Sequence, residues 1–190
     1  MTSQRKIKMT AGRFLDWTAT QPNGRFELEN GVIIEMAAEQ AQHALMKFAA
    51  TKALERGLRE AHLPCTVFPD GMTAVVDEEH VRLPDASVQC SPVDPEATRL
   101  SSPIILVEVV SPTSVSRDED LKLVDYFLIP SVEHYLILYP RRRKVVHFRR
   151  SHDGRSDVVT RFLTSGVIDL TPPGFCVAVE DLLGPVAGSV

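Results

Sequence analysis

Cysteine is scarce in this chain, with only Cys65, Cys90 and Cys176 among 190 residues. The three lie far apart, are odd in number and contain no CxxC pair, which argues against both a disulfide framework and a thiolate metal site. We therefore predict three unpaired, inert thiols. This use of cysteine favours a reducing, cytoplasmic location.

Long hydrophobic runs are also missing. No stretch approaches the ~20 consecutive apolar residues that are needed to span a bilayer. The N-terminal segment MTSQRKIKMTAGRF is basic but lacks the apolar centre of a signal peptide. We therefore predict a protein that is neither exported nor embedded in a membrane.

An excess of positive charge is the third absence: the formal net charge is -4 and the pI is about 5.9. No overall basic field would attract nucleic acid, so such binding needs a local cluster. One cluster exists, made of Arg141, Arg142, Arg143 and Lys144 together with Arg149 and Arg150. It could follow a nucleic-acid backbone, or it could be solubilising charge at a hairpin turn. The sequence leaves both interpretations open.

Length and composition indicate one globular domain, since hydrophobic residues make up 44% of the chain and charged residues 24%. We place this single domain at residues 10–182. Residues 1–9 are predicted to form a mobile N-terminal tail, and residues 183–190 a C-terminal tail.

In the first half of the chain, Thr10 can cap a short helix that contains Phe14 and Trp17. Asn30-Gly31 lies between two apolar runs and predicts a tight hairpin. Helical spacing of apolar residues then predicts a long helix from about residue 41 to 61, with these residues on its buried face: Ala44, Leu45, Phe48, Ala49 and Leu58.

Most of the remaining chain predicts strands, at residues 66–76, 81–90, 104–110, 134–139, 144–149 and 158–163. Ser116 and Glu119 form a capping box that opens a helix to about Leu128. Asp153-Gly154 predicts a second hairpin turn. The order of elements indicates an α/β (α+β) protein with a mixed central sheet and flanking helices.

Glu108 stands out because it interrupts an unbroken apolar strand, residues 104–110. A carboxylate inside a buried strand is unfavourable unless it is paired or binds a metal. Asp85, in Leu83-Pro84-Asp85, is the obvious partner from a neighbouring strand. Two carboxylates suit Mg²⁺ or Mn²⁺, and such a site can activate water for attack on a phosphodiester. The alternative is that Glu108 is a structural acid paired with a basic residue.

The chemistry also needs a cation near the developing negative charge. A lysine two residues after the acid would supply it, but Val110 occupies that position. Lys122, in the first turns of the next helix, can take this role if Leu121, Val124 and Leu128 bury the other face. The alternative is an ordinary solvated lysine.

The Asp, the Glu and the displaced Lys are where a family likeness becomes visible. The sequence resembles the Uma-type restriction-endonuclease-like proteins, a bacterial group with a PD-(D/E)XK nuclease fold. The likeness spans roughly residues 10–182, and its matching pieces occur in the following order: Phe26-Glu27-Leu28 with Gly31, His43, Leu83-Pro84-Asp85, Val107-Glu108-Val109 with Ser111-Pro112, Asp118 to Lys122 with Tyr126, and Val132-Glu133-His134-Tyr135. This chain has Leu136 and Tyr139 where the family commonly has a tryptophan and an acid.

The resemblance implies that Asp85 and Glu108 bind the metal and that Lys122 is the migrated catalytic lysine. Glu27 and His43 match further recurring positions. Glu27 or Glu35 could complete the metal shell, and His43 could contact a phosphate or assist proton transfer. Each of these three could equally be an ordinary polar residue.

Three hypotheses of different class follow. The first is a Mg²⁺- or Mn²⁺-dependent DNA endonuclease. The second is a binding module for nucleic acid or protein in which the acids are structural. A third hypothesis is a dimeric interaction protein whose apolar strands pair at a sheet edge. A homodimer is also compatible with the first hypothesis, because enzymes that cut both strands often act as dimers.

Overall fold

The computed structural model describes residues 8–110, 116–153 and 157–185, with the side chains of the third helix described from Leu121 onward. Its elements, in chain order, are α1 (Ala11–Thr18), β1 (Phe26–Glu29), β2 (Val32–Glu35), α2 (Ala41–Glu60), β3 (Thr66–Pro69), β4 (Ala74–Val75), β5 (Val81–Arg82), β6 (Ala86–Gln89), β7 (Pro103–Val109), α3 (Ser116–Leu128), β8 (His134–Tyr139), β9 (Lys144–Arg150), β10 (Val158–Leu163), β11 (Val167–Leu170), β12 (Phe175–Ala178) and α4 (Val179–Leu183).

A six-stranded sheet in the order β10-β9-β8-β7-β6-β3 forms the centre of the molecule. Its neighbouring strands are antiparallel except for β7 and β8, which run parallel and are joined through α3. Parallel neighbours require a crossover, and a helix is the usual one. The predicted α+β class with a mixed sheet is confirmed.

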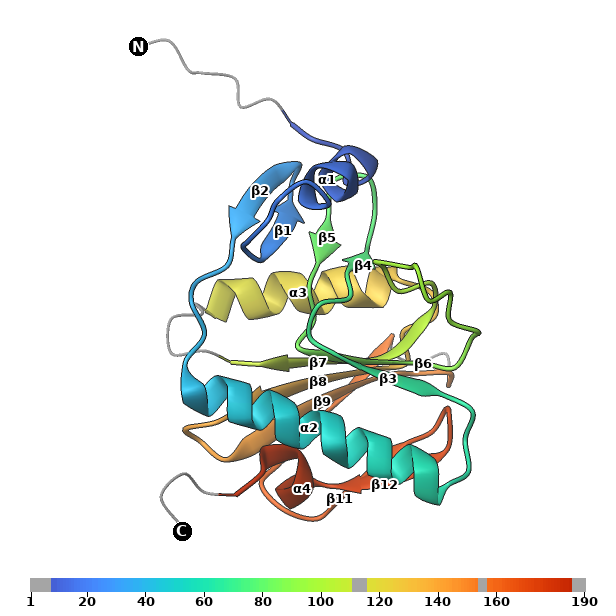
Figure 1. Ribbon diagram of the computed structural model, residues 1–190. Coiled ribbons are helices and arrows are strands. Elements are labelled where there is room, and N and C mark those ends of the chain that lie inside the picture. Colours follow the sequence, from blue (N-terminus) through green and yellow to red (C-terminus); the bar gives the residue numbers. More distant parts are fainter. Residues whose placement is uncertain (1–7, 111–115, 154–156, 186–190) are drawn as a thin grey trace.

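The helices cover both faces of this sheet (Figure 1). On one face α2 packs with α4 and the β11–β12 hairpin, and on the other lies α3. Beyond α3 stand α1 and a small sheet of order β2-β1-β5-β4. In β7, Ile105, Val107 and Val109 face the α2 layer and Leu106 faces the α3 layer. By strand alternation Glu108 points the same way as Leu106.

Several short-range predictions are confirmed. Asn30 and Gly31 both have positive φ, 50° and 73°, and they join β1 to β2 in register as a tight hairpin. The Thr10 side chain accepts a hydrogen bond from the Arg13 backbone N–H at the start of α1. The long helix appears as α2 within one residue of its predicted end.

Three short elements near the C-terminus were not predicted, and two predicted features cannot be compared with the structure. The strands β11 and β12 and the helix α4 were not predicted, because each is only four or five residues long and Pro172-Pro173 separates the two strands. The predicted helix from Ser116 to Leu128 is confirmed as α3, whereas the side chains of its capping box, Ser116 and Glu119, and Gly154 of the predicted turn lie outside the described residues.

The buried faces of α2 and α3 were predicted wrongly, apart from Leu58 of α2, which is buried as predicted. In α2, Leu45 and Phe48 are 64% exposed, and the core is formed by Met46, Ala50, Ala53, Leu54 and Leu58. In α3, Val124 and Leu128 are 61% and 57% exposed, whereas Lys122, Asp125 and Tyr126 are buried. Apolar periodicity favoured the wrong stripe of α3, because its buried face is held by charged and hydrogen-bonded groups rather than by apolar ones.

Near the N-terminus, the Met9 backbone N–H donates to the Gly31 carbonyl and Lys8 pairs with Glu79, so ordered chain begins before residue 10. The rest of the predicted N-terminal tail, residues 1–7, lies outside the described residues. Within the described ranges, the helices fall short of the length and apolar character that a bilayer crossing demands.

The prediction of three free thiols is wrong, because Cys65 and Cys90 form a disulfide. Cys65 immediately precedes β3 and Cys90 immediately follows β6, and these strands pair with Thr66 opposite Gln89. The antiparallel register therefore brings the two cysteines face to face, with their Cα atoms 4.0 Å apart. A separation of 25 residues in sequence concealed this pair, and the argument from cysteine for a cytoplasmic location is lost.

A buried histidine pair joins β8 to β9. His134 and His147 stack with ring centroids 5.1 Å apart, and His134 Nδ1 lies 2.9 Å from His147 Nε2. The His134 Nε2 atom must donate to the Pro172 carbonyl, 2.8 Å away, so its Nδ1 accepts from His147. The His147 Nδ1 atom is left buried without a partner among the described residues. Burial lowers the pKa of His134 to about 4 and the pKa of His147 to about 3.

The disulfide makes a simple prediction about thiol content. Protein purified without reductant and then denatured should expose one reactive thiol, Cys176, to Ellman's reagent, and three after reduction. Cys176→Ser is the control and should show none before reduction. Three thiols in the unreduced wild type would contradict the Cys65–Cys90 bond.

The histidine pair makes a prediction about pH. A histidine whose pKa is lower in the folded state stabilises the fold fully above its unfolded pKa of about 6.5 and loses that contribution as the pH falls towards the folded value. His147→Gln keeps an N–H donor for His134 but cannot titrate. We expect the free energy of unfolding to fall less steeply in this variant between pH 6.5 and 4, by up to about 1.4 kcal/mol per pH unit. Urea denaturation of both proteins across this range measures the difference, and parallel curves would refute it.

Candidate functional site

Asp85 occupies the bend that precedes β6 and is 2% exposed. Its backbone N–H donates to the Val107 carbonyl at 2.9 Å, and its Oδ2 atom accepts the Val109 N–H at 2.7 Å. Pro84 restricts the backbone just before it. The carboxylate is therefore fixed against β7, beside the residue that follows Glu108.

Glu108 projects from β7 towards α3 and is 9% exposed. Its Oε1 atom accepts hydrogen bonds from Lys122 Nζ at 3.1 Å and from the Tyr126 hydroxyl at 2.5 Å. Lys122 and Tyr126 lie one turn apart on α3, so both reach the same carboxylate. Lys122 thus reaches Glu108 from α3, as expected from the sequence because Val110 occupies the usual lysine position.

Glu27 receives the same lysine on its other side, with Lys122 Nζ 2.9 Å from Glu27 Oε1. Glu27 also accepts the Leu83 backbone N–H at 3.0 Å and pairs with Arg82 at 3.2 Å. Arg82 is 1% exposed and pairs with Glu29 and Asp125 as well. These residues form a buried charge network, comprising Glu27, Arg82, Glu108, Lys122 and Asp125, that joins the small sheet, α3 and the central sheet.

The electrostatics of this network differ between its two central carboxyls. Burial raises the pKa of Glu108 to about 7; Lys122 opposes the shift, while the negative charges of Asp85 and Glu27 add to it. For Glu27, burial acts in the same upward direction, but Lys122, the Leu83 N–H and Arg82 outweigh it and lower the pKa. Glu27 is thus the carboxylate that stays ionised, and Glu108 is the one that gains most from an added cation.

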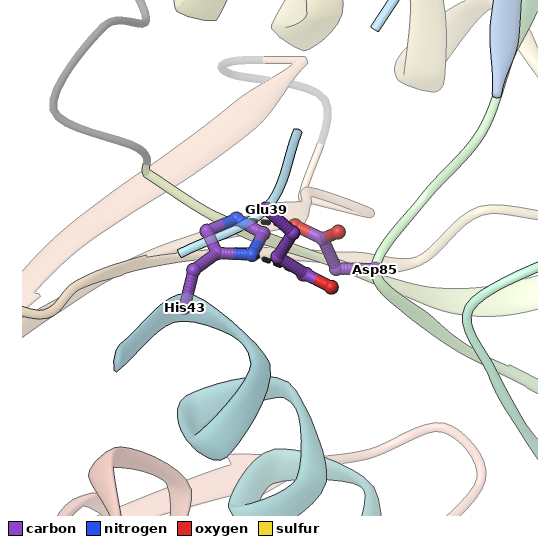
Figure 2. Close-up of side chains that lie close together, drawn as sticks. All are labelled: Glu39, His43 and Asp85. Atoms are coloured by element: carbon purple, nitrogen blue, oxygen red, sulfur yellow. Dashed lines mark hydrogen bonds and ion pairs between the residues drawn. The ribbon is translucent and has the colours of Figure 1, made fainter. Parts of the chain in front are cut away.

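A second cluster lies on the α2 side of Asp85. His43, in the first turn of α2, places its Nε2 atom 3.5 Å from Asp85 Oδ2 and 2.6 Å from the Val109 carbonyl oxygen. Its Nδ1 atom is 2.5 Å from Oε1 of Glu39. Figure 2 shows Glu39, His43 and Asp85 pointing towards one another. One donor atom from each lies within 4.8 Å of the other two, a spacing at which they could hold a metal ion.

Basic residues surround this second cluster. Lys47, one turn after His43, lies 2.7 Å from Glu39 and 3.4 Å from Asp85, and it pairs closely with Asp70. Arg25 reaches Asp70 at 2.7 Å and Asp85 at 3.7 Å. Burial would lower the pKa of Lys47, but its hydrogen bonds to Asp70 and Glu39 raise it, so the ammonium stays charged.

The sequence predicted Asp85, Glu108, Lys122, Glu27 and His43 as site residues. Six other residues of the two clusters were not predicted: Glu39, Lys47, Asp70, Arg25, Arg82 and Asp125. Two signals could have found some of them. Lys47 follows His43 by four residues on one helix face, and Arg82 lies three residues before Asp85. Glu35 is exposed on β2.

The basic cluster at the β8–β9 turn has mixed roles. Arg143 donates to the carbonyls of Leu183 and Gly184, and thereby satisfies the C-terminal end of α4. Arg150 donates to the carbonyls of Phe127, Ile129 and Val132 around the end of α3. Lys144 lies over the rings of Tyr139 and Phe162, at 4.4 and 5.6 Å. Arg141 and Arg142 are exposed.

Comparison with known proteins gives one family and one fold. The family model described as "Uma2: Putative restriction endonuclease" matches residues 11–180. An uncharacterized protein of Synechocystis sp. is 23% identical over 175 residues, covering 91% of this chain and 90% of the relative. A crystal structure described as "a putative nuclease belonging to DUF820" from Anabaena variabilis superposes with a TM-score of 0.68 at 14% identity, covering 92% of this chain and 97% of the other.

The buried charge network predicts a stability effect at Arg82. Removing one partner of a buried ion pair leaves uncompensated charge, here on Glu27 and Asp125, and typically costs about 3–5 kcal/mol. We expect Arg82→Met to lower the free energy of unfolding by roughly that amount. Lys8→Met breaks the exposed Lys8–Glu79 pair and should cost less than about 1 kcal/mol. Urea denaturation compares the two, and similar small losses would contradict a supporting role for the network.

Proposed function

This chain belongs to the Uma2 family, described as "Putative restriction endonuclease", and we propose that it is a divalent-metal-dependent nuclease that hydrolyses DNA phosphodiester bonds. One observation carries the proposal. Asp85 is fixed to the residue after Glu108, and the Lys122 ammonium reaches Glu108 from α3. The β6–β7 register supports a position of Asp85 beside Glu108, and Glu108 is paired with the cation from α3.

The two carboxylates fit a divalent cation. Mg²⁺ and Mn²⁺ prefer oxygen donors, and Asp85 and Glu108 supply them from a nearly buried position. The charge of Asp85 makes Glu108 harder to ionise, which is a repulsion that a shared cation offsets. We therefore assign Asp85 and Glu108 as the residues that would hold the ion. Such an ion, when bound, acidifies water and neutralises charge on a phosphate.

Lys122 would stabilise the negative charge that develops on the phosphate or orient the attacking water. Its ammonium is held between Glu27 and Glu108, so its position is defined before any substrate arrives. Glu27 acts through Lys122 and is a positioning residue. Lys122, the Leu83 N–H and Arg82 together outweigh the effect of burial and lower the pKa of Glu27, so the lysine retains a charged partner on the side away from Glu108.

The surface at the ends of β7 and β8 also supports a nucleic-acid substrate. Val109, at the end of β7, lies opposite Leu138 of the parallel strand β8. The turn that carries Arg141 and Arg142 follows β8, which runs parallel to β7, so the turn lies at the same end of the sheet as the end of β7 (Figure 1). Because β6 is antiparallel to β7, Asp85, which precedes β6, lies at this end as well. Exposed arginines there can contact phosphates, whereas Arg143 is occupied by α4.

A second candidate function, a non-enzymatic binding module, is favoured by a different observation. Glu108 already accepts two hydrogen bonds, from Lys122 and Tyr126, and Lys122 is 6% exposed. The network is thus satisfied by protein groups alone. In this case the acids support the fold, and nucleic acid or a protein binds without being cleaved.

The test is cleavage of plasmid DNA by purified protein with Mg²⁺ or Mn²⁺. We expect Asp85→Asn to lose the metal-dependent rate and Lys122→Met to lower it roughly 100-fold or more, the usual effect of removing a group that stabilises transition-state charge. Glu96→Gln, in an exposed loop, is the control and should match wild type.

Cleavage that is unchanged in Asp85→Asn would refute the assigned site. DNA binding without cleavage under any of these ions, with Asp85→Asn still folded, would favour the binding module instead.

A further inference from the structure

We propose that Glu39 and His43 form, with Asp85, a divalent-cation site at the start of α2, and that its imidazole donor makes the site prefer Mn²⁺ to Mg²⁺. The inference rests on the proposed metal dependence. It adds two ligands to Asp85 and names the ion that they select, neither of which follows from Asp85 and Glu108 alone. Glu39 precedes α2, His43 lies in its first turn and Asp85 precedes β6, so two segments that are far apart in the sequence converge here (Figure 2).

His43 is held through one of its two ring nitrogens. The Val109 carbonyl can only accept, so the Nε2 atom of His43 carries a proton and donates to it at 2.6 Å. Metal-binding histidines typically have their second ring N–H held in this way by a carbonyl or carboxylate, which fixes the ring orientation. The Nδ1 atom is therefore the ring nitrogen that can bind a metal ion, and it faces the Glu39 carboxylate at 2.5 Å.

The other ring nitrogen, Nδ1, is in close contact with Glu39. A lone pair and a carboxylate repel each other, and the 2.5 Å between the two atoms leaves room only for a shared proton. A metal ion would replace that proton once the two atoms moved apart to admit it. Proton and metal ion are therefore alternatives at the same atom. Asp85 is the third donor, and its Oδ2 atom is already held by the Val109 N–H. One peptide residue of β7 thus anchors both His43 and Asp85.

The charges around the cluster also favour a cation. Three carboxylates, Glu39, Asp70 and Asp85, face the ammonium of Lys47 and the guanidinium of Arg25. With a neutral imidazole this leaves one negative charge in excess. Lys47 competes with an ion for Glu39 and Asp85, but its close pair with Asp70 gives the ammonium a separate partner. The site can accept a dication without leaving Lys47 unpaired.

The donor set decides the metal. Carboxylate oxygens alone suit Mg²⁺, Ca²⁺ and Mn²⁺, whereas imidazole nitrogen favours the transition metals. One imidazole with two carboxylates therefore selects Mn²⁺ over Mg²⁺. Mg²⁺ can still bind between Asp85 and Glu108, because both side chains offer oxygen ligands only.

The experiment uses Mn²⁺ as the probe, with the full chain and no DNA. Pulsed electron paramagnetic resonance of the Mn²⁺-loaded protein should show ¹⁴N modulation from a coordinated imidazole, and His43→Gln should remove it. Calorimetry should show Mn²⁺ affinity reduced at least 10-fold in His43→Gln and in Glu39→Gln, with Mg²⁺ affinity changed less than about 3-fold. His152→Gln replaces an exposed histidine and is the matched control.

Absence of nitrogen modulation in wild type, its persistence in His43→Gln, or no Mn²⁺ binding at millimolar concentration would each overturn the inference. The wild-type spectrum alone is decisive if a variant fails to fold. Failure of the proposed function is distinguishable: Mn²⁺-dependent DNA cleavage without nitrogen modulation refutes this site only, and modulation without cleavage refutes the nuclease only.

Discussion

The pairing of buried charges across three layers is the interaction on which the site depends. Glu27 of the small sheet, Lys122 and Asp125 of α3 and Glu108 of the central sheet are connected through short ion pairs, with Arg82 between Glu27 and Asp125. Unpaired, each of these groups would be strongly unfavourable in a buried position. The network therefore forms only when all three layers are in place, and this explains why α3 buries its polar stripe and leaves Val124 and Leu128 exposed.

The backbone of β7 serves the other half of the site. The N–H of Val109 binds Asp85 and its carbonyl binds His43, while the side chain packs in the core below the sheet. A hydrogen-bonded strand in the middle of a sheet is one of the most rigid positions in a domain. Asp85 and His43 thus derive their geometry from β7, although neither belongs to it, and Glu108 is carried by the neighbouring residue of the same strand.

Much of the fold followed from local patterns. The Asn30-Gly31 hairpin, the extent of α2 and the strands from β7 to β10 depend on turn chemistry and on the alternation of apolar residues, which act over a few residues. The wrong predictions all concern features that depend on contacts between residues far apart in the sequence. The Cys65–Cys90 bond depends on strand register, and the buried faces of α2 and α3 depend on which neighbour each helix meets. The short elements β11, β12 and α4 carry too few residues to show a pattern.

The candidate site divides in the same way. The sequence alone determined that Glu108 is an acid in an apolar strand, that Asp85 follows Leu83-Pro84 and that no lysine lies two residues after Glu108, because these are properties of consecutive residues. Only the tertiary structure decided that Lys122 lies between Glu27 and Glu108, that Arg82 holds Glu27, and that Glu39 and Lys47 join His43 beside Asp85. These contacts join residues up to 95 positions apart, and pairings at such distances are determined by how layers pack.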